Sequence, residues 1–194
     1  MRKLLFFISA LFLVQCLSAK RVVVTQKQSE QYAGNITQHC IYRTTHKNIE
    51  IINHLKYIEV KRDGATVASF DPVQIDRNSL YIWVGLSPNG KMILFTTSDQ
   101  GTFICNLKGQ ILYRLGKGVN ATNWWTNRYL VGMVDQDNGL DFTHSDLVLV
   151  DIKKGTRISI PTDDEISIYP CAAKPYIHYF TIDNVKHTIK LKFK

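Results

Sequence analysis

Apolar residues along most of this chain come in short runs that are separated by Gly, Asn, Asp and Pro. Some runs alternate with polar residues, so that Ile189, Leu191 and Phe193 would share one face of a strand. Other runs, such as residues 146–151, are almost continuously apolar, which is typical of a strand buried on both faces. Beyond the first twenty residues there is scarcely any helical periodicity. The pattern therefore predicts an all-β domain.

Similar turns recur at a regular spacing and predict a structural repeat. Their last residues are Gly64, Gly109 and Gly155, which lie about 45 residues apart. In each turn an Asn or Asp can hydrogen-bond its own backbone two residues on, and the glycine can adopt the positive φ of a tight hairpin. A repeat of this length, made of four strands, is typical of one blade of a β-propeller.

A second tight turn, Ser-Pro-Asn-Gly-Lys at residues 87–91, keeps step with the first, and we expect degenerate versions at 124–128 and 169–175. This turn, the apolar strand after it and a strand that ends in Asp or Asn, a hydrophobic residue, Lys and Gly together resemble the blades of TolB-type propellers. The propeller domains of dipeptidyl peptidase IV-like enzymes carry the same pattern. The resemblance is clear over residues 80–115 and fair over 121–160. It implies a propeller fold, and since propellers host unrelated activities it implies no particular function.

The expected strands make four blades of four antiparallel strands, the first unit covering roughly residues 38–70. The last unit supplies three strands before the sequence stops, while an orphan β-branched strand lies at 21–25. We therefore expect Val22 to Val24 to pair beside Ile189 to Phe193 as the outermost strand of the last blade, which would protect an open edge. Related propellers usually have more blades. The chain is thus either a closed small propeller or an open, partial one that a partner completes.

The first residues have the features of a secretory signal. Arg2 and Lys3 precede an uninterrupted apolar run at 4–14, which is too short to span a bilayer, and small or uncharged residues follow it. We expect a signal peptide at residues 1–19 and a β-propeller domain at 20–194. The mature protein would be exported to the periplasm or the extracellular space.

The cysteines leave one alternative open for the N-terminus. Cys16 ends a segment that is similar to a degraded bacterial lipobox, in which it would carry a lipid, although Gln15 has the wrong size for that motif. Lipidation would make the protein a membrane-anchored component of the envelope. The remaining Cys40, Cys105 and Cys171 are widely spaced and odd in number, so they predict neither a disulfide framework nor a zinc site. One disulfide stays open in an oxidising compartment.

An acidic loop is the best candidate for a cation site. Asp135 and Asp137 place oxygen ligands at alternating positions, and Asp141 follows after a glycine, in a pattern similar to a calcium loop. However, the glycine comes one position early for an EF-hand and no Glu closes the loop. A solvated hairpin loop is the favoured interpretation, and calcium binding remains the alternative.

Histidine and tryptophan residues give two weaker signals. The spacing of His39, His46 and His54 matches no metal-ligand pattern, so we expect ordinary exposed or hydrogen-bonded histidines. Consecutive strand residues point to opposite faces, so Trp124 and Trp125 predict one core residue and one exposed neighbour. The exposed one would be the best aromatic candidate for contact with a partner.

No motif in the sequence indicates catalysis or a cofactor. The nucleophile elbow, the zinc-protease helix, the phosphate loop and the dinucleotide turn are all missing, although a triad assembled across distant blades stays open. The net charge of +8 favours mild attraction to acidic surfaces such as phospholipid headgroups, and the scattered Lys and Arg argue against nucleic acid. We therefore expect a non-catalytic, exported module for protein interaction or envelope scaffolding. The alternative is an accessory propeller, derived from an enzyme, that binds a glycan or a peptide.

Overall fold

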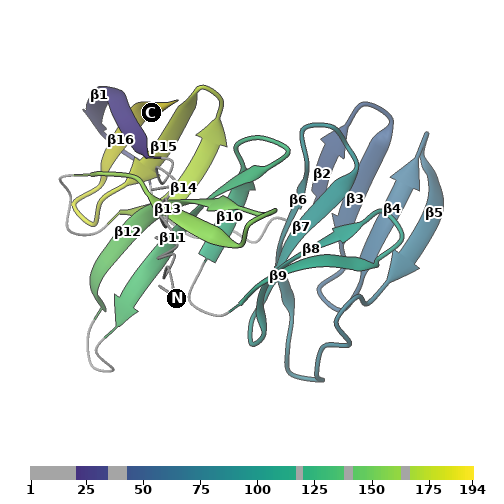
Figure 1. Ribbon diagram of the computed structural model, residues 1–194. Coiled ribbons are helices and arrows are strands. Elements are labelled where there is room, and N and C mark those ends of the chain that lie inside the picture. Colours follow the sequence, from purple (N-terminus) through teal and green to yellow (C-terminus); the bar gives the residue numbers. More distant parts are fainter. Residues whose placement is uncertain (1–20, 35–42, 117–119, 138–141, 163–166) are drawn as a thin grey trace, which may run out of the picture.

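The structure is a computed structural model that describes residues 21–34, 43–116, 120–137, 142–162 and 167–194. These residues form sixteen β-strands (Figure 1). The described part of the chain contains no helix long and apolar enough to cross a membrane.

The strands make four antiparallel sheets of four strands each, which confirms the predicted fold class. Sheet 1 contains β2 (Arg43–His46), β3 (Ile49–Asn53), β4 (Ile58–Arg62) and β5 (Ala65–Phe70). Sheet 2 contains β6 (Tyr81–Leu86), β7 (Met92–Thr97), β8 (Gly101–Asn106) and β9 (Ile111–Gly116). Sheet 3 contains β10 (Asn120–Trp124), β11 (Tyr129–Asp137), β12 (Phe142–Asp151) and β13 (Thr156–Ser159). Sheet 4 contains β14 (Ile168–Ala173), β15 (Tyr176–Phe180), β16 (Val185–Phe193) and β1 (Val22–Gln31).

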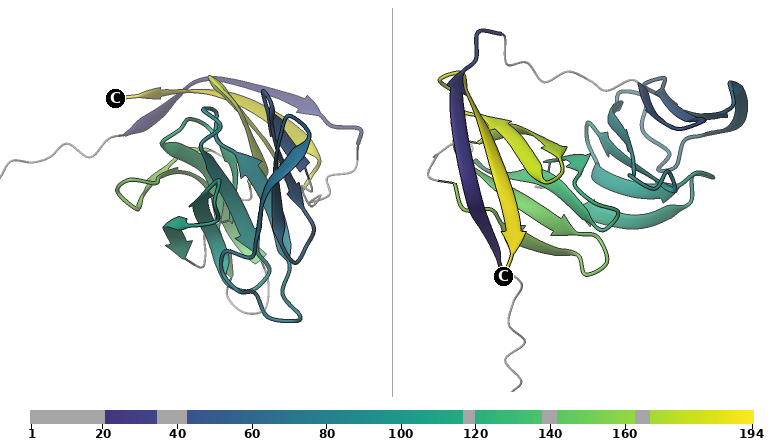
Figure 2. Two further views of the ribbon diagram at one scale, coloured as in Figure 1. Left: turned by 90° about the vertical axis from the view of Figure 1, so that its right-hand side faces the viewer. Right: turned by 90° about the horizontal axis from the view of Figure 1, so that it is seen from above.

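Three apolar cores join neighbouring sheets in an open arc. Ile51 and Phe95 belong to the core between sheets 1 and 2, and Leu94 belongs to the core between sheets 2 and 3. Leu149 and Ile177 belong to the core between sheets 3 and 4. Viewed from above, sheet 4 and sheet 1 lie at the two ends of this arc (Figure 2, right). Among the described residues no apolar cluster joins these two sheets, so the molecule is an open, four-blade propeller-like arrangement.

The chain's first strand completes its last sheet, as predicted. Val22 pairs with Phe193 and Val24 with Leu191, and β1 runs antiparallel to β16 along its whole length. The buried Val22 packs in the core between sheets 3 and 4. The strand continues to Gln31, which is further than the sequence predicted. Residues 26–31 are all exposed and polar, so they lack the apolar alternation by which strands are predicted.

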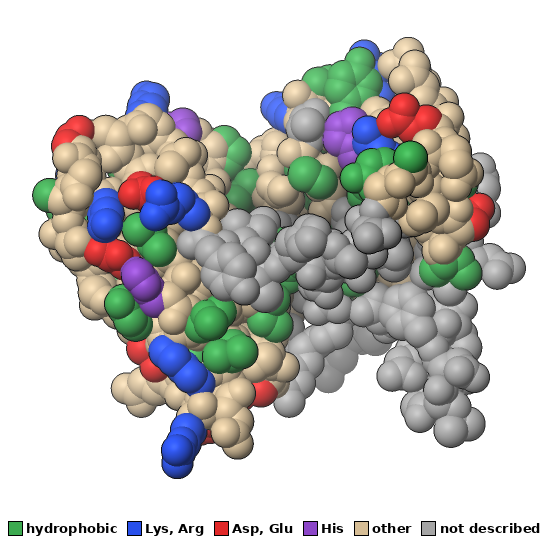
Figure 3. Space-filling view, turned by 180° about the vertical axis from the view of Figure 1, so that it is seen from behind, with side chains coloured by type: hydrophobic (Ala, Val, Ile, Leu, Met, Phe, Trp, Pro, Cys, Tyr) green, Lys and Arg blue, Asp and Glu red, His purple; other side chains and the backbone are tan. Residues whose placement is uncertain are grey.

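The outward faces of the two end sheets are polar. On sheet 1, Arg43 Nε lies 3.1 Å from Glu50 Oε1, and His54 Nε2 lies 2.8 Å from Glu59 Oε2. Seen from behind, side chains of both charges and histidines are interspersed on both sides of the molecule (Figure 3). End units with a polar outer face are what keeps a row of stacked repeats soluble. The ends of the arc are therefore suited to water or to a polar partner rather than to another apolar sheet.

Gly64, Gly109 and Gly155 occupy the same place in successive sheets, as the repeat predicts. Each lies in the turn between the third and fourth strands of its sheet, and their φ angles are +81°, +81° and +65°. In sheets 2 and 3 the residue that opens the turn accepts a hydrogen bond from the backbone N–H two residues on: Asn106 from Lys108 and Asp151 from Lys153. In sheet 1 the turn is a two-residue Asp-Gly loop instead.

Substitution of these glycines by alanine is expected to give different losses of stability. All three would meet the cost of a positive φ, roughly 1–2 kcal/mol. A Cβ on Gly109 would also lie 2.6 Å from the Phe70 ring of sheet 1, whereas Gly64 and Gly155 have nothing within 4 Å. Denaturant titration of Gly109→Ala should therefore show the largest loss, about 2–4 kcal/mol. Equal losses at the three positions would contradict the packing of Phe70 on this turn.

The predicted turn at 169–175 is wrong. Residues up to Ala173 belong to β14, and the turn is confined to Lys174 and Pro175, whose peptide bond is cis. Pairing between β14 and β15 is irregular between Ile168 and Cys171, where Pro170 lies. A proline has no N–H to give to a ladder, so it is tolerated at such an irregularity. The proline made this segment look like a turn in the sequence.

Candidate interaction surfaces

The predicted cation and histidine sites are not assembled within the described residues. Asp135 and Asp137 belong to β11, and Asp141 lies outside the described residues, so calcium binding stays an alternative prediction. No group of three or more His, Cys, Asp or Glu in the described segments could hold a metal ion. His46 ends β2 at the β2–β3 turn, whereas His54 follows β3 at the other end of that hairpin. His39 lies outside the described residues.

Both tryptophans are buried, which corrects the prediction of one exposed neighbour. Trp124 is 5% exposed and packs between sheets 2 and 3, where its Nε1 donates to the carbonyl of Gly85 at 3.0 Å. Trp125 is 6% exposed and packs between sheets 3 and 4 against Phe193. The two side chains do point to opposite faces, but sheet 3 has a neighbour on each side. Neither is available to a partner.

The two described cysteines form no disulfide. Cys105 is buried, and desolvation raises the pKa of its thiol to about 12. Cys171 is exposed, and both thiols are free. Cys16 and Cys40 lie outside the described residues, so lipidation and a disulfide from Cys40 stay predictions.

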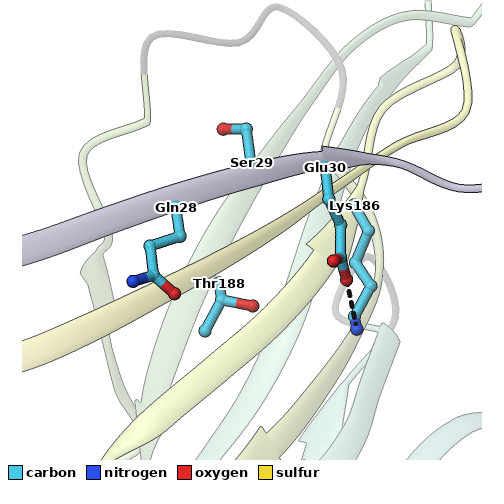
Figure 4. A pocket seen from close by; sticks show the side chains of 5 residues that line it. All are labelled: Gln28, Ser29, Glu30, Lys186 and Thr188. Carbon is cyan, nitrogen blue, oxygen red and sulfur yellow. Dashed lines mark hydrogen bonds and ion pairs between the residues drawn. The ribbon is translucent and has the colours of Figure 1, made fainter.

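Sheet 4 carries a polar depression on its outward face, which we call the sheet 4 groove. Gln28, Glu30, Lys186 and Thr188 project into it from β1 and β16, while Ser29 points to the opposite side of the strand (Figure 4). The depression has a volume of about 450 Å³. Lys186 Nζ donates to Glu30 Oε1 at 2.8 Å, and this hydrogen bond lowers the pKa of Glu30. The groove thus offers both signs of charge and uncharged donors and acceptors.

The same face continues from the groove onto β15. Thr188 lies opposite His178, and their Oγ1 and Nδ1 atoms are 2.8 Å apart. Burial, followed by the nearby Lys186 charge, lowers the pKa of His178, so the ring is neutral at physiological pH. The exposed Tyr176 lies beyond them on the same face. The ammonium group of Lys190 lies over its ring, 5.9 Å from the ring centroid. The face therefore combines an exposed aromatic ring with hydrogen-bonding side chains held in register by paired strands.

Ser29 and His187 form a hydrogen bond between β1 and β16 on the inner side of sheet 4. The Oγ–Nδ1 distance is 2.7 Å, and the His187 ring is buried and stacks on Tyr179. A serine and a histidine are two members of a hydrolytic triad. Here the ring is packed within the fold, so we assign this pair to holding β1 against β16. No sequence motif singled out this contact or the groove, because both depend on the pairing of the two ends of the chain.

No family model matches the chain, and no curated protein matches its sequence. The resemblance to TolB-type propellers therefore stays a prediction.

Proposed function

We propose that this protein is an exported, non-catalytic binding module that recognises a protein partner through the outward face of sheet 4. Export rests on the basic start and the apolar run at residues 4–14, which have the pattern of a signal peptide. The periplasm or the extracellular space is the proposed location. A binding role fits a rigid frame of four sheets whose cores are packed between neighbours.

The single observation that supports this surface is the composition of the open end of the arc. A sheet in the middle of the arc buries both faces in apolar cores, but the outward face of sheet 4 keeps Gln28, Lys186 and Thr188 around the groove. Tyr176 lies on the same face and is 38% exposed. Exposed tyrosine surrounded by hydrogen-bonding groups is typical of the contact residues in protein interfaces.

A glycan or peptide is the second candidate ligand of the same face. An aromatic ring flanked by polar side chains can also stack on a sugar. Here His178 lies two residues along β15 from Tyr176, and Thr188 is its partner on β16. The exposed edge of β1 could add an extended peptide as a further strand. The face should capture a protein in the first case and a glycan or a peptide in the second.

Site-specific photo-crosslinking in the producing cells tests the proposal. A photoreactive amino acid in place of Gln28 or Tyr176 should give a discrete protein adduct upon illumination. The matched control is Leu112 on sheet 2, which is 44% exposed and lies on another part of the molecule. An equal adduct from position 112, or none from 28 and 176, would contradict a protein-binding role for this face. Retention of the protein on immobilised glycans, lost upon Tyr176→Ala, would instead select the glycan alternative.

A further inference from the structure

Each sheet has a basic residue in the turn between its first and second strands. We call these four turns the inner turns. They contain Lys47, Lys91, Arg128 and Lys174. The three lysines are exposed and Arg128 is partly exposed. A basic residue thus recurs once per sheet at the same place.

These inner turns lie next to one another in space. The backbone N–H of Asn89 in sheet 2 donates to Asn127 Oδ1 in sheet 3 at 2.9 Å. On the other side, a Cβ on Gly90 would lie 2.9 Å from the ring of His46 in sheet 1. The inner turns of sheets 1, 2 and 3 therefore form a continuous surface.

The outer strands add further basic residues at the same ends of their sheets. Arg62 ends the third strand of sheet 1, and the turns between the third and fourth strands of sheets 2 and 3 contain Lys108 and the pair Lys153 and Lys154. In sheet 4 the corresponding place is held by the ends of the paired strands, where the backbone N–H of Lys194 donates to the carbonyl of Arg21 at 2.9 Å. All of these side chains are exposed. We call the surface made by the inner and outer turns and these two strand ends the turn face.

The described acidic residues of the turn face are already engaged. Asp151 is 2% exposed and receives Arg128 Nη2 at 2.6 Å, which lowers the pKa of its carboxyl group. Asp63 accepts two hydrogen bonds from the Asn48 amide, at 3.0 and 3.1 Å. By contrast, Asp76, Asp99 and Asp183 lie in connections at the opposite ends of the sheets. The net positive charge is therefore concentrated on the turn face.

The chain also enters the fold at this face. Arg21 precedes β1 directly, so the apolar run at residues 4–14 joins the domain where the basic turns gather. A segment of this kind belongs in a membrane, either during export or as a retained or lipid-linked anchor. Only a few residues separate it from Arg21. While that segment is attached and lies in a membrane, the basic turns lie beside the membrane surface.

From this juxtaposition we propose that the turn face docks onto anionic phospholipid headgroups. Each Lys or Arg close to an anionic bilayer contributes about 1 kcal/mol of attraction, and the contributions accumulate across a broad surface. The sheet 4 groove would then be held beside the membrane for its partner.

Nucleic acid is the less favoured anionic partner. The sequence argument against it, that the basic residues are scattered, does not hold on this face, because the fold gathers them. However, the aromatic residues at this end, Trp125, Tyr129 and Phe193, pack against one another between sheets 3 and 4. They are not available to stack on bases, as single-strand binders require. The adjoining apolar segment likewise fits a bilayer and not a nucleic acid.

Vesicle co-sedimentation of the purified protein, in the form that the cells produce, tests the proposal. We expect preference for vesicles with about one-third phosphatidylglycerol over pure phosphatidylcholine, and loss of that preference in about 0.5 M salt. A variant with Lys47→Gln, Lys91→Gln and Lys174→Gln should weaken binding to the anionic vesicles on the order of 100-fold. The control variant with Lys27→Gln, Arg77→Gln and Arg114→Gln removes the same charge away from the turn face and should bind nearly as well.

Equal losses in the two variants, or equal binding to both vesicle types, would overturn the proposal. Tighter binding to duplex DNA than to the vesicles, lost in the same lysine variant, would assign the face to nucleic acid instead. A retained anchor would raise binding to both vesicle types and leave their ratio informative. Substitution of Tyr176 should not change vesicle binding, so failure here and failure of the proposed protein-binding face are separate results.

Discussion

A chain that begins at Gln28 instead of Arg21 is expected to lose roughly 3–5 kcal/mol of stability, a large part of what a domain of this size has. The deletion removes Val22, which is 5% exposed, and Val24, which packs against the same core. It also uncovers Leu191 and the edge of β16, whose backbone groups would then lack their ladder partners. The shortened protein should therefore unfold at a lower urea concentration and tend to associate through the open edge.

The matched control is a chain that begins at Arg21, which keeps all of β1 and should unfold like the longer protein. Substitution of Gln31 by Ala at the exposed end of β1 should change stability by no more than about 0.5 kcal/mol. Added peptide with the sequence of residues 21–31 should restore part of the lost stability. Unchanged unfolding and a monomeric profile for the chain that begins at Gln28 would show that β1 does not complete sheet 4.

Replacement of Trp124 or Trp125 by alanine is expected to cost about 3–5 kcal/mol, because each of the two fills a different core. Trp124 is part of the core between sheets 2 and 3, and Trp125 is part of the core between sheets 3 and 4. Two large and similar effects from these consecutive residues would show that sheet 3 is packed on both faces. A cost below about 1 kcal/mol at either position would mean that one face of sheet 3 is open.

Phenylalanine substitutions separate the hydrogen bond from the packing. Trp124→Phe leaves the carbonyl of Gly85 without the indole donor, whereas the buried Nε1 of Trp125 has no hydrogen-bond partner. The loss of volume is the same at the two positions. Urea titrations should therefore show Trp124→Phe to be the more damaging by about 1 kcal/mol. The reverse order would contradict the contact with Gly85.

The sequence was most informative where the physical signal is local. Gly64, Gly109 and Gly155 mark their turns because a positive φ strongly favours glycine. Pairing of β1 with β16 could be predicted by counting strands, since an incomplete last sheet needs a partner. The signal failed at Pro170, where a residue typical of turns lies in an irregular strand.

The proposed surfaces could not be predicted from the sequence, because each is formed by residues that only the folded chain brings together. The sheet 4 groove joins Glu30 to Lys186, residues that only the closure of the last sheet brings together. The turn face depends on which ends of the strands share a side, so Lys47, Lys91 and Lys174 look like isolated charges in the sequence. The burial of both tryptophans likewise depends on sheet 3 lying between two other sheets. Each of these features follows from topology rather than from local pattern.

The claim that the chain's own first strand completes the last sheet can be tested most directly with one disulfide. Val23 and Lys192 lie opposite each other in the β1–β16 register. Residues paired in this way have Cα separations that a disulfide can span. In a protein whose Cys40 and Cys171 are serines, Val23→Cys with Lys192→Cys should oxidise to a disulfide-linked monomer that unfolds at a higher urea concentration. Thiols that stay free under oxidation, or a covalent dimer in which β1 comes from a second copy, would contradict the account.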